Sequence, residues 1–341
     1  MNEQVLIPTV IGLSLVFIFT NGFQDGSSVT ATAIASRSLT PAQTITLVAS
    51  AEFLGALLGG SAVANTIQAI TNCPADLNLL PVLSSGLLAA IIWNFLTRFV
   101  RFPSSSTHAL VGGIVGAIIT QTGNDKFIVW GSPDNLIHPS GLWKVLVSLF
   151  LSPLIGFLAG YLCLILIFIA LLRSSTKVNR PLKSMQWLTV GALAFGHGAN
   201  DTQKAMGVML LCLKAVGIQT GDEIPLWVRL STGIVMALGI ISLAHGIVKR
   251  VGSGIFKIQP VHALASQIAS ASVILVGSAT GGPVAASQVI ASTVIGVGSA
   301  QRKKGVHWLV ARDMLVAWFL TIPGSALLAS LIHLALVRHF H

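Results

Sequence analysis

The sequence predicts an all-α polytopic membrane protein: two inverted-topology repeats of about five helical elements each, with broken helices and re-entrant hairpins at a central site. Composition is the first reason. Of the 341 residues, 53% are hydrophobic and 9% are charged, and the mean hydropathy is +0.83, whereas roughly a quarter of a soluble domain is charged. Duplication is the second reason, because a Gly-x-amide-Asp frame ending at Asp25 recurs at Asp201, about half a chain later. Pro103 and Pro283 keep nearly the same offset. Polar positions that recur within apolar segments are typical of secondary transporters.

Apolar stretches long enough to cross a bilayer, about 17 to 25 residues, recur from one end of the chain to the other. The stretch 142–172 would form about 46 Å of helix at 1.5 Å per residue, so it must tilt, break or protrude. In contrast, 104–121 and 283–299 are short, begin after a proline and are rich in Gly, Ser and Thr, which makes them candidates for arms of re-entrant hairpins. The ten predicted elements are centred on residues 5–23, 41–62, 81–98, 104–121, 142–172, 187–216, 225–247, 260–279, 283–299 and 308–336.

The turns between these elements alternate in charge. Arg and Lys gather in every second turn, whereas the intervening turns are richer in Asp, Glu, Asn and Pro or carry no charge. By the positive-inside rule the basic turns face the cytoplasm and both termini lie outside, in what we expect to be a bacterial plasma (inner) membrane. Five elements per half is an odd number, so the second half enters the membrane opposite to the first. The basic turns lie near Arg37, Arg98 and Arg101, Arg173 to Lys183, Lys249 to Lys257, and Arg302 to Lys304.

The order of apolar elements and basic turns also predicts how the chain is divided and which partners it contacts. We predict a first transmembrane repeat over 1–172, a basic cytoplasmic linker over 173–186 and a second, inverted repeat over 187–341. The net charge of +10 is assigned to contacts with anionic membrane lipid. It is not assigned to nucleic acid, because the chain has no basic stripe with interleaved aromatic residues. The three cysteines are too few and too scattered for a disulfide framework or a metal cluster.

Three of the ten acidic residues, Asp25, Glu52 and Asp201, lie in apolar segments. A carboxylate inside hydrocarbon is costly and usually marks an ion pathway. Asp25 and Asp201 each follow a Gly-containing break, three residues after the glycine, where we expect an unwound backbone that exposes carbonyls for a cation and amides for an anion. The plainer alternative is a helix cap. Glu52 is either a proton carrier or a ligand for a coupling cation, and its plainer alternative is a packing residue bonded across a helix interface.

The segment Pro103-Ser-Ser-Ser-Thr107 resembles an anion cradle. Proline suits the first turn of a helix, hydroxyl groups gather there, and the free amides of a helix N-terminus favour negative charge. Helix caps also use serine and threonine, so a cap is the alternative. The counterpart at 283–287 keeps the proline and one hydroxyl, Ser287, so we expect an asymmetric site in which this half supplies backbone amides.

The paired motifs contain no arginine, and Lys204 is the only cation within them. An anion would then be held by amides, hydroxyls and bound cations, which favours cation-coupled symport over a permanently positive pore. His108 and His197 flank the motifs and could titrate near neutral pH, although a buried histidine bonded to a backbone partner is the commoner case.

Three ordered motifs make the chain similar to the PiT family of inorganic phosphate transporters over essentially its whole length. Asn21-Gly22, Asp25 and Ser36-Arg-Ser-Leu-Thr-Pro41 match the family's first signature, His197 to Gly207 match the second, and Pro103 to His108 match its Pro-Ser-Ser-Ser-x-His. The resemblance implies uptake of phosphate by alternating access, coupled to sodium ions or protons, with no other cofactor and in a homodimer. The implied phosphate ligands are Asp25, Gln24, Ser104, Ser105, Ser106, Thr107, Asn200, Asp201 and Ser287. The implied coupling-ion residues are Asn21, Asp25, Thr32, Glu52, Asp201 and Gln203.

Departures from the family pattern keep other substrates open. Gln24 and Gln288 replace family histidines, which counts against proton coupling through those positions, and Ala285 and Ala286 replace hydroxyl residues. Fewer hydroxyls leave a sulfate or metal-phosphate permease as the alternative. Phosphate is favoured because it can donate a proton to a carboxylate, whereas a bare carboxylate repels sulfate unless a cation lies between them.

Two other classes of function are weighed against a symporter. Two membrane aspartates could form an intramembrane aspartyl hydrolase, but such a dyad needs neither an anion cradle nor a duplicated Ser/Pro hairpin. A passive anion channel would be favoured by rings of Arg or Lys along a pore, and the sequence shows none. We therefore expect a transporter and not an enzyme.

Overall fold

The structure is a computed structural model that describes residues 3–74, 79–100, 104–131, 139–242 and 257–340. Within these ranges it is almost entirely helical, and the β pairing is limited to an isolated bridge between Thr71 and Ile128. The predicted residues Arg101, Pro103 and Lys249 lie outside the described ranges. The long helices are α1 (Glu3–Ala35), α2 (Pro41–Leu58), α4 (Leu79–Val100), α5 (Ser106–Thr122), α6 (Gly141–Leu171), α7 (Asn179–Ala215), α8 (Leu226–Ile241), α9 (Pro260–Thr280), α10 (Ala286–Arg302) and α11 (Trp308–Phe340), with a short α3 (Ala62–Gln68) between α2 and α4.

The all-helical membrane fold is confirmed. Six described helices are long and apolar enough to cross a membrane, and α6 has the highest hydropathy among them. Leu154, Leu158, Leu162 and Leu166 leave a leucine stripe exposed along α6, which is the surface expected against lipid tails. The chain is an integral membrane protein.

Each of the ten predicted elements corresponds to one long helix. Two details differ from the prediction. The turn predicted at 63–80 contains α3, and α7 begins at Asn179, within the range predicted as a linker. Leu182 and Gln186 are buried on this first part of α7, so packing against neighbouring helices keeps it helical.

The expected breaks in the helices at Asp25 and Asp201 are absent, and that prediction is wrong. α1 and α7 are continuous through both motifs. The glycines serve close packing instead: a Cβ at Gly198 would collide with the backbone of Glu52, and one at Gly22 with the backbone carbonyl of Met236. A glycine inside a helix thus brings a second backbone near without unwinding its own.

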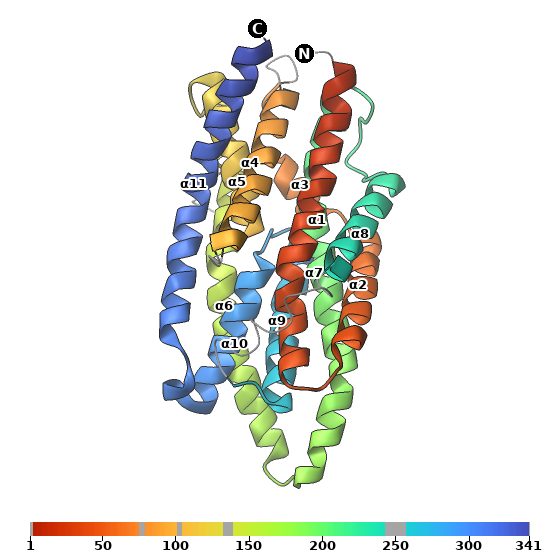
Figure 1. Cartoon of the computed structure of the whole chain (residues 1–341), viewed down its shortest axis with the longest axis vertical. Helices are drawn as coiled ribbons and strands as arrows, with labels where there is room; N and C mark the ends of the chain where they lie inside the picture. Colours follow the sequence, from red (N-terminus) through yellow and green to blue (C-terminus); the bar gives the residue numbers. More distant parts are fainter. Residues whose placement is uncertain (1–2, 75–78, 101–103, 132–138, 243–256, 341) are drawn as a thin grey trace.

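Non-helical backbone occurs instead at the turns of two helical hairpins. Ser104 and Ser105 precede α5, and residues 281–285 precede α10. α5 packs against α4 and α11, and α10 packs against α9 and α6. Figure 1 shows α4 ending about halfway along the long axis of the molecule, so the N-terminus of α5 starts deep inside it. This depth supports the prediction of a re-entrant hairpin.

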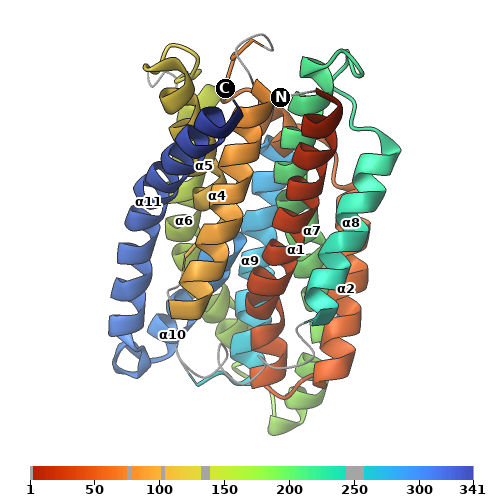
Figure 2. The same ribbon diagram turned by 45° about the horizontal axis from the view of Figure 1, so that its top comes forward.

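The helices form an elongated bundle with α11 at one edge and α8 with α2 at the other (Figures 1 and 2). Between them, α1 and α7 lie in contact and run in opposite directions (Figure 1). Neighbours also correspond between halves: α1 packs on α8 and α4, and α7 packs on α2 and α9. These correspondences support the inverted repeat, which remains a prediction. One hydrophobic cluster includes residues of both halves, such as Phe17 and Val208, so the halves share a core.

Candidate functional site

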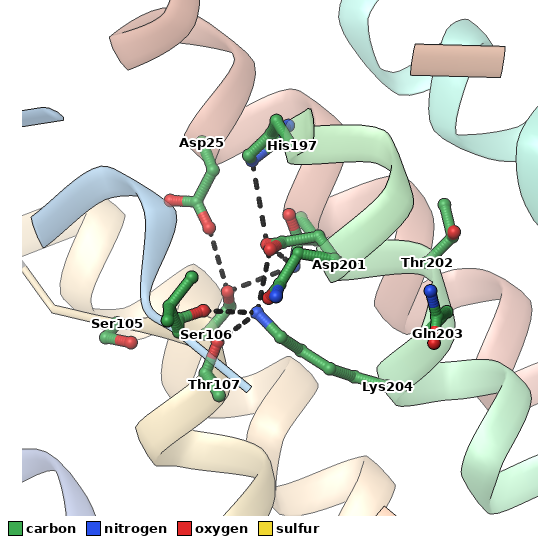
Figure 3. A network of polar contacts seen from close by, with 12 residues as sticks. Asp25, Ser105, Ser106, Thr107, His197, Asp201, Thr202, Gln203 and Lys204 are labelled. Carbon is green, nitrogen blue, oxygen red and sulfur yellow. Dashed lines mark hydrogen bonds and ion pairs between the residues drawn. The ribbon is translucent and has the colours of Figure 1, made fainter. Parts of the chain in front are cut away.

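The site forms where α1 and α7 meet the N-terminus of α5 (Figure 3). Residues three or four apart lie on one face of a helix, which places Asn21 with Asp25 on α1 and His197 with Asp201 and Lys204 on α7. All five are buried, and Asp201 and Lys204 have no exposed surface. Charged groups are thus held entirely inside the protein, at a depth where each needs a partner.

Asp201 is the most connected of these groups. Its Oδ1 accepts a hydrogen bond from Lys204 Nζ at 2.7 Å, and its Oδ2 accepts one from Asn21 Nδ2 at 3.0 Å. His197 Nε2 lies 3.6 Å from the same Oδ2. One ligand atom each from Asp25, His197 and Asp201 lie within 4.8 Å of one another. The two aspartates that the sequence singled out therefore share one polar space.

The first turn of α5 supplies hydroxyl groups to this space (Figure 3). Ser106 Oγ donates to Asp25 Oδ2 at 2.8 Å and accepts from Asn21 Nδ2 at 3.1 Å. Thr107 Oγ1 accepts from Lys204 Nζ at 2.6 Å. The predicted cradle therefore reaches both long helices through two of its members.

Two other hydroxyl residues of the cradle, Ser104 and Ser105, hold the turn. Ser105 caps α5, because its side chain accepts a hydrogen bond from the backbone amide of His108. Ser104 Oγ donates to Thr97 Oγ1 at 2.7 Å, which ties the turn to the end of α4. Ser105 is thus a helix cap, whereas the anion cradle stays a prediction for the other hydroxyl residues of the segment.

The second hairpin contributes backbone atoms. Val284 O accepts from Lys204 Nζ at 2.8 Å, and Gly282 O accepts from Asn200 Nδ2 at 3.1 Å. The expected asymmetry between the two hairpins is present, although these contacts use carbonyls where the sequence predicted amides. Ser287 is half-buried and takes part in none of these described contacts. Lys204 thus joins α7 to both hairpins.

Glu52 belongs to the same buried cluster through a histidine. His197 Nδ1 lies 2.8 Å from Glu52 Oε1, and neither side chain is exposed. Since His197 also approaches Asp201, the carboxylate on α2 is linked to the centre of the site. This contact across the interface of α2 and α7 also fits the plainer alternative, a packing glutamate bonded to a polar neighbour, so the role of Glu52 in ion coupling stays a prediction.

Three predicted residues lie outside this cluster. Gln203 accepts from the backbone amides of Val63 and Ala64 at the start of α3, at 2.9 and 3.3 Å, and donates to carbonyls of Gly59 and Ala199. It is two residues from Asp201, about 200° around the helix, so it faces away. Thr32 Oγ1 accepts a hydrogen bond from Gln267 Nε2 of α9 at 3.0 Å. Gln24, next to Asp25, is half-buried.

Lys204 and His197 are central residues that the sequence did not assign to the site. Lys204 follows Asp201 by three residues and His197 precedes it by four. These are the spacings at which helical side chains become neighbours. A lysine inside an otherwise apolar helix is costly without a partner, and this cost was the signal that could have identified Lys204.

Several buried oxygens in the site have no partner among the described residues. They are Asn21 Oδ1, Asn200 Oδ1 and Glu52 Oε2. Buried acceptors are normally satisfied by protein, water or an ion. Carboxylate and amide oxygens are hard ligands that suit hard cations. The arrangement therefore offers oxygen ligands to a cation beside hydroxyl, amide and ammonium donors that suit an anion.

Comparison with known proteins gives concordant similarities. The model of the "Phosphate transporter family" matches residues 21–329. The chain is 34% identical over 335 residues to the "Probable low-affinity inorganic phosphate transporter" of Bacillus subtilis, covering 97% of each chain. It is 33% identical to a protein of the same description from Rhizobium meliloti, covering 98% of each. The solved structure of "The sodium-dependent phosphate transporter" matches with a TM-score of 0.86 at 22% identity, covering 98% of this chain and 99% of that one, which shows a common fold.

Proposed function

Because the chain belongs to the phosphate transporter family, we propose that it is a secondary active symporter that imports inorganic phosphate together with sodium ions by alternating access. One observation carries the proposal. Two buried carboxylates, Asp25 and Asp201, share a space with the hydroxyl-bearing N-terminus of α5 and with the ammonium group of Lys204. Such a space holds ligands for an anion and for a cation at the same place.

Electrostatics explains why the two ions should bind together. Two unit charges 4 Å apart interact by about 4 kcal/mol at an effective dielectric constant near 20, so an anion beside an unneutralised carboxylate is strongly repelled. A sodium ion held by Asp25 and Asp201 would remove this repulsion. The unpaired Oδ1 atoms of Asn21 and Asn200 add neutral oxygen ligands, which supports sodium as the coupling ion.

Phosphate would be held by donors from three helices. The hydroxyls of Ser106 and Thr107 and the free amides of the first turns of α5 and α10 favour an anion. Lys204 supplies positive charge. Phosphate can also donate a proton to Asp25 or Asp201, whereas sulfate only accepts, so the retained carboxylates favour phosphate as substrate.

The basic ends of the helices face the cytoplasm and both termini lie outside the plasma membrane. The halves rock about the fixed site to expose it alternately to each side. The buried pair of Glu52 and His197 is the place at which protons would couple to transport if sodium did not, so the test includes both ions.

The test is uptake of radiolabelled phosphate by proteoliposomes with imposed sodium or proton gradients, with and without competing sulfate. We expect sodium-driven accumulation that sulfate does not reduce and that Asp25→Asn and Asp201→Asn abolish. Asp222→Asn is the matched control, because Asp222 is 77% exposed and pairs only with Lys214 in the described structure. Accumulation of sulfate instead would assign a different substrate, and accumulation driven by protons alone would move the coupling to Glu52 and His197. Downhill flux without accumulation would refute symport.

A further inference from the structure

A second buried polar network lies beyond the central site, where α1 ends and α7 and α9 begin. It joins Thr32 of α1, Gln186 and Thr189 of α7, and Gln267 of α9. Gln186 and Gln267 have no exposed surface, and Thr32 is 2% exposed. At 1.5 Å per residue, Thr32 lies about 10 Å along α1 from Asp25. The network is therefore separate from the site but on the same helices.

Gln267 is the centre of this network. Its Nε2 donates to Thr32 Oγ1 at 3.0 Å and to Gln186 Oε1 at 3.1 Å. Its Oε1 accepts from Thr189 Oγ1 at 2.6 Å. One amide thus bonds α9 to α1 and twice to α7. Both of its protons and its oxygen are used.

Gln186 extends the network to the end of α1. Its Nε2 donates to Ser38 Oγ at 2.7 Å and to Pro260 O at 3.2 Å, and its Oε1 accepts from Ser36 Oγ at 3.3 Å. The side-chain amides of Gln186 and Gln267 are fully paired, unlike those of Asn21 and Asn200. A satisfied network is a closed contact between helices and does not ask for a ligand.

The opposite end of the bundle is closed by different chemistry. The offset between the repeats is 176 residues for Asp25 and Asp201, 179 for Pro81 and Pro260, and 180 for Pro103 and Pro283, and these offsets define equivalent positions. Five polar members of the network have an apolar or thiol residue as their equivalent, whereas the equivalent of Ser38 is Lys214. The pairs are Thr32 with Val208, Ser36 with Cys212, Gln186 with Val10, Thr189 with Leu13, and Gln267 with Leu87 or Leu88. Val208, Cys212, Val10 and Leu87 are all fully buried.

We propose that Thr32, Ser36, Gln186, Thr189 and Gln267 form a polar latch, the gate that closes the substrate site toward the end of the bundle with the basic turns. The proposal rests on transport by alternating access. Opening this end must separate α1 from α7 and α9, and water can replace each broken hydrogen bond at little net cost. The released amides and hydroxyls would then line a polar path for the ions. The opposite end opens by parting apolar contacts, so the two gates respond differently to substitution.

The latch is tested by the reactivity of a cysteine placed behind it. Ser28 lies on α1 between Asp25 and Thr32 and is half-buried. In Ser28→Cys, a water-soluble maleimide modifies residue 28 when the latch end opens. Native Cys212, at the opposite end, reports on the other gate, and mass spectrometry separates the two sites. Thr32→Val removes the acceptor for one Gln267 proton, which leaves a buried donor unpaired. We expect modification of residue 28 to become about 5- to 30-fold faster, with no rise at Cys212.

A compensating variant and a conservative variant test whether faster modification of residue 28 is due to the unpaired donor. Adding Gln267→Leu and Thr189→Val to Thr32→Val removes the unpaired donor together with the hydroxyl that Gln267 accepts from, and imitates the apolar end, so modification should return to within about twofold of the parent. Thr32→Ser keeps the hydroxyl and should behave as the parent. Thr321→Val is the matched control, because Thr321 is fully buried and bonds only within α11 in the described structure.

The proposal is overturned if Thr32→Val leaves modification of residue 28 unchanged, or if the triple variant is as reactive as the single one. An equal rise at residue 28 and Cys212 also overturns it, because general loosening and not a gate would explain that result. Binding of radiolabelled phosphate to the same purified variants, with sodium present, is measured in parallel. Absent phosphate binding with intact latch behaviour would refute the proposed substrate and leave the latch standing.

Discussion

Replacing Lys204 by methionine separates a role in ion binding from a structural one. The buried ammonium donates to Asp201, Thr107 and the carbonyl of Val284. Methionine keeps the length and apolar stem of the side chain and removes the charge. We expect Lys204→Met to weaken phosphate binding and to strengthen sodium binding. Loss of the positive charge should change the affinities for the anion and for the cation in opposite directions, whereas loss of packing would weaken the binding of both ions.

The magnitudes follow from the contacts. Hydrogen bonds to charged groups contribute about 1.5–3 kcal/mol, so the affinity for phosphate should fall about 10- to 100-fold. Lys204 Nζ lies 2.7 Å from Asp201 Oδ1. A sodium ion on the other side of that carboxylate would be about 6 Å from the ammonium, where the repulsion is about 3 kcal/mol at a dielectric constant near 20. Reorganisation of Asp201 offsets part of this gain, and about tenfold tighter sodium binding is expected.

Binding of radiolabelled phosphate and, without phosphate, of radiolabelled sodium to purified protein in detergent measures both changes. Lys214→Met is the control on the same helix, because Lys214 pairs with the exposed Asp222 and such pairs contribute little. Removing one partner of a buried pair costs about 3–5 kcal/mol, so the variant is checked for monodispersity. If the single variant fails to fold, the double variant that combines Lys204→Met with Asp201→Asn is used, because it removes both charges of the buried pair. Unchanged phosphate affinity, or a parallel loss of both ions, would refute the assignment of Lys204 to the anion.

Ser106→Ala removes the hydroxyl that donates to Asp25. We therefore expect the KM for phosphate in uptake kinetics to rise about 5- to 30-fold, with little change in Tm. An unchanged KM would contradict this prediction. Gly198→Ala places a methyl group against the backbone of α2, so Tm and uptake should both fall, whereas Gly12→Ala, which meets open space, should leave both unchanged. Gln203→Leu leaves two backbone amides of α3 unpaired, so the free energy of unfolding should fall by about 1–3 kcal/mol for each. The sodium dependence of uptake should keep its midpoint, and a shifted midpoint would return Gln203 to the coupling-ion site.

The helical membrane fold and the two central aspartates were predictable from the sequence. Carboxylates are so costly in hydrocarbon that their few positions are informative without any structure. Their recurrence at one offset predicted the candidate site, and Ser106 and Thr107 were predicted from the duplicated proline hairpins. The same reasoning identified Glu52, although its partner His197 is 145 residues away in sequence.

The helix breaks expected at Gly22 and Gly198 are absent, because a glycine within an apolar segment is compatible with two different structures. Glycine permits an unusual backbone conformation, and it also permits another helix to approach closely. Both uses leave the same residue in the sequence. Only the position of α2 against Gly198, and of α8 against Gly22, shows that close approach is the use made here.

Composition, charge and duplication thus specify which segments are helices and which helices carry ionisable groups, because these depend on transfer of side chains between water and lipid. Which atoms meet depends on rotation and register between helices. Gln203 and Lys204 are adjacent in sequence but point about 100° apart on α7. Packing directs Gln203 to the start of α3 and Lys204 to the site. The tertiary structure alone makes this choice, since a rotation of one residue about a helix axis leaves every sequence pattern unchanged and replaces every contact.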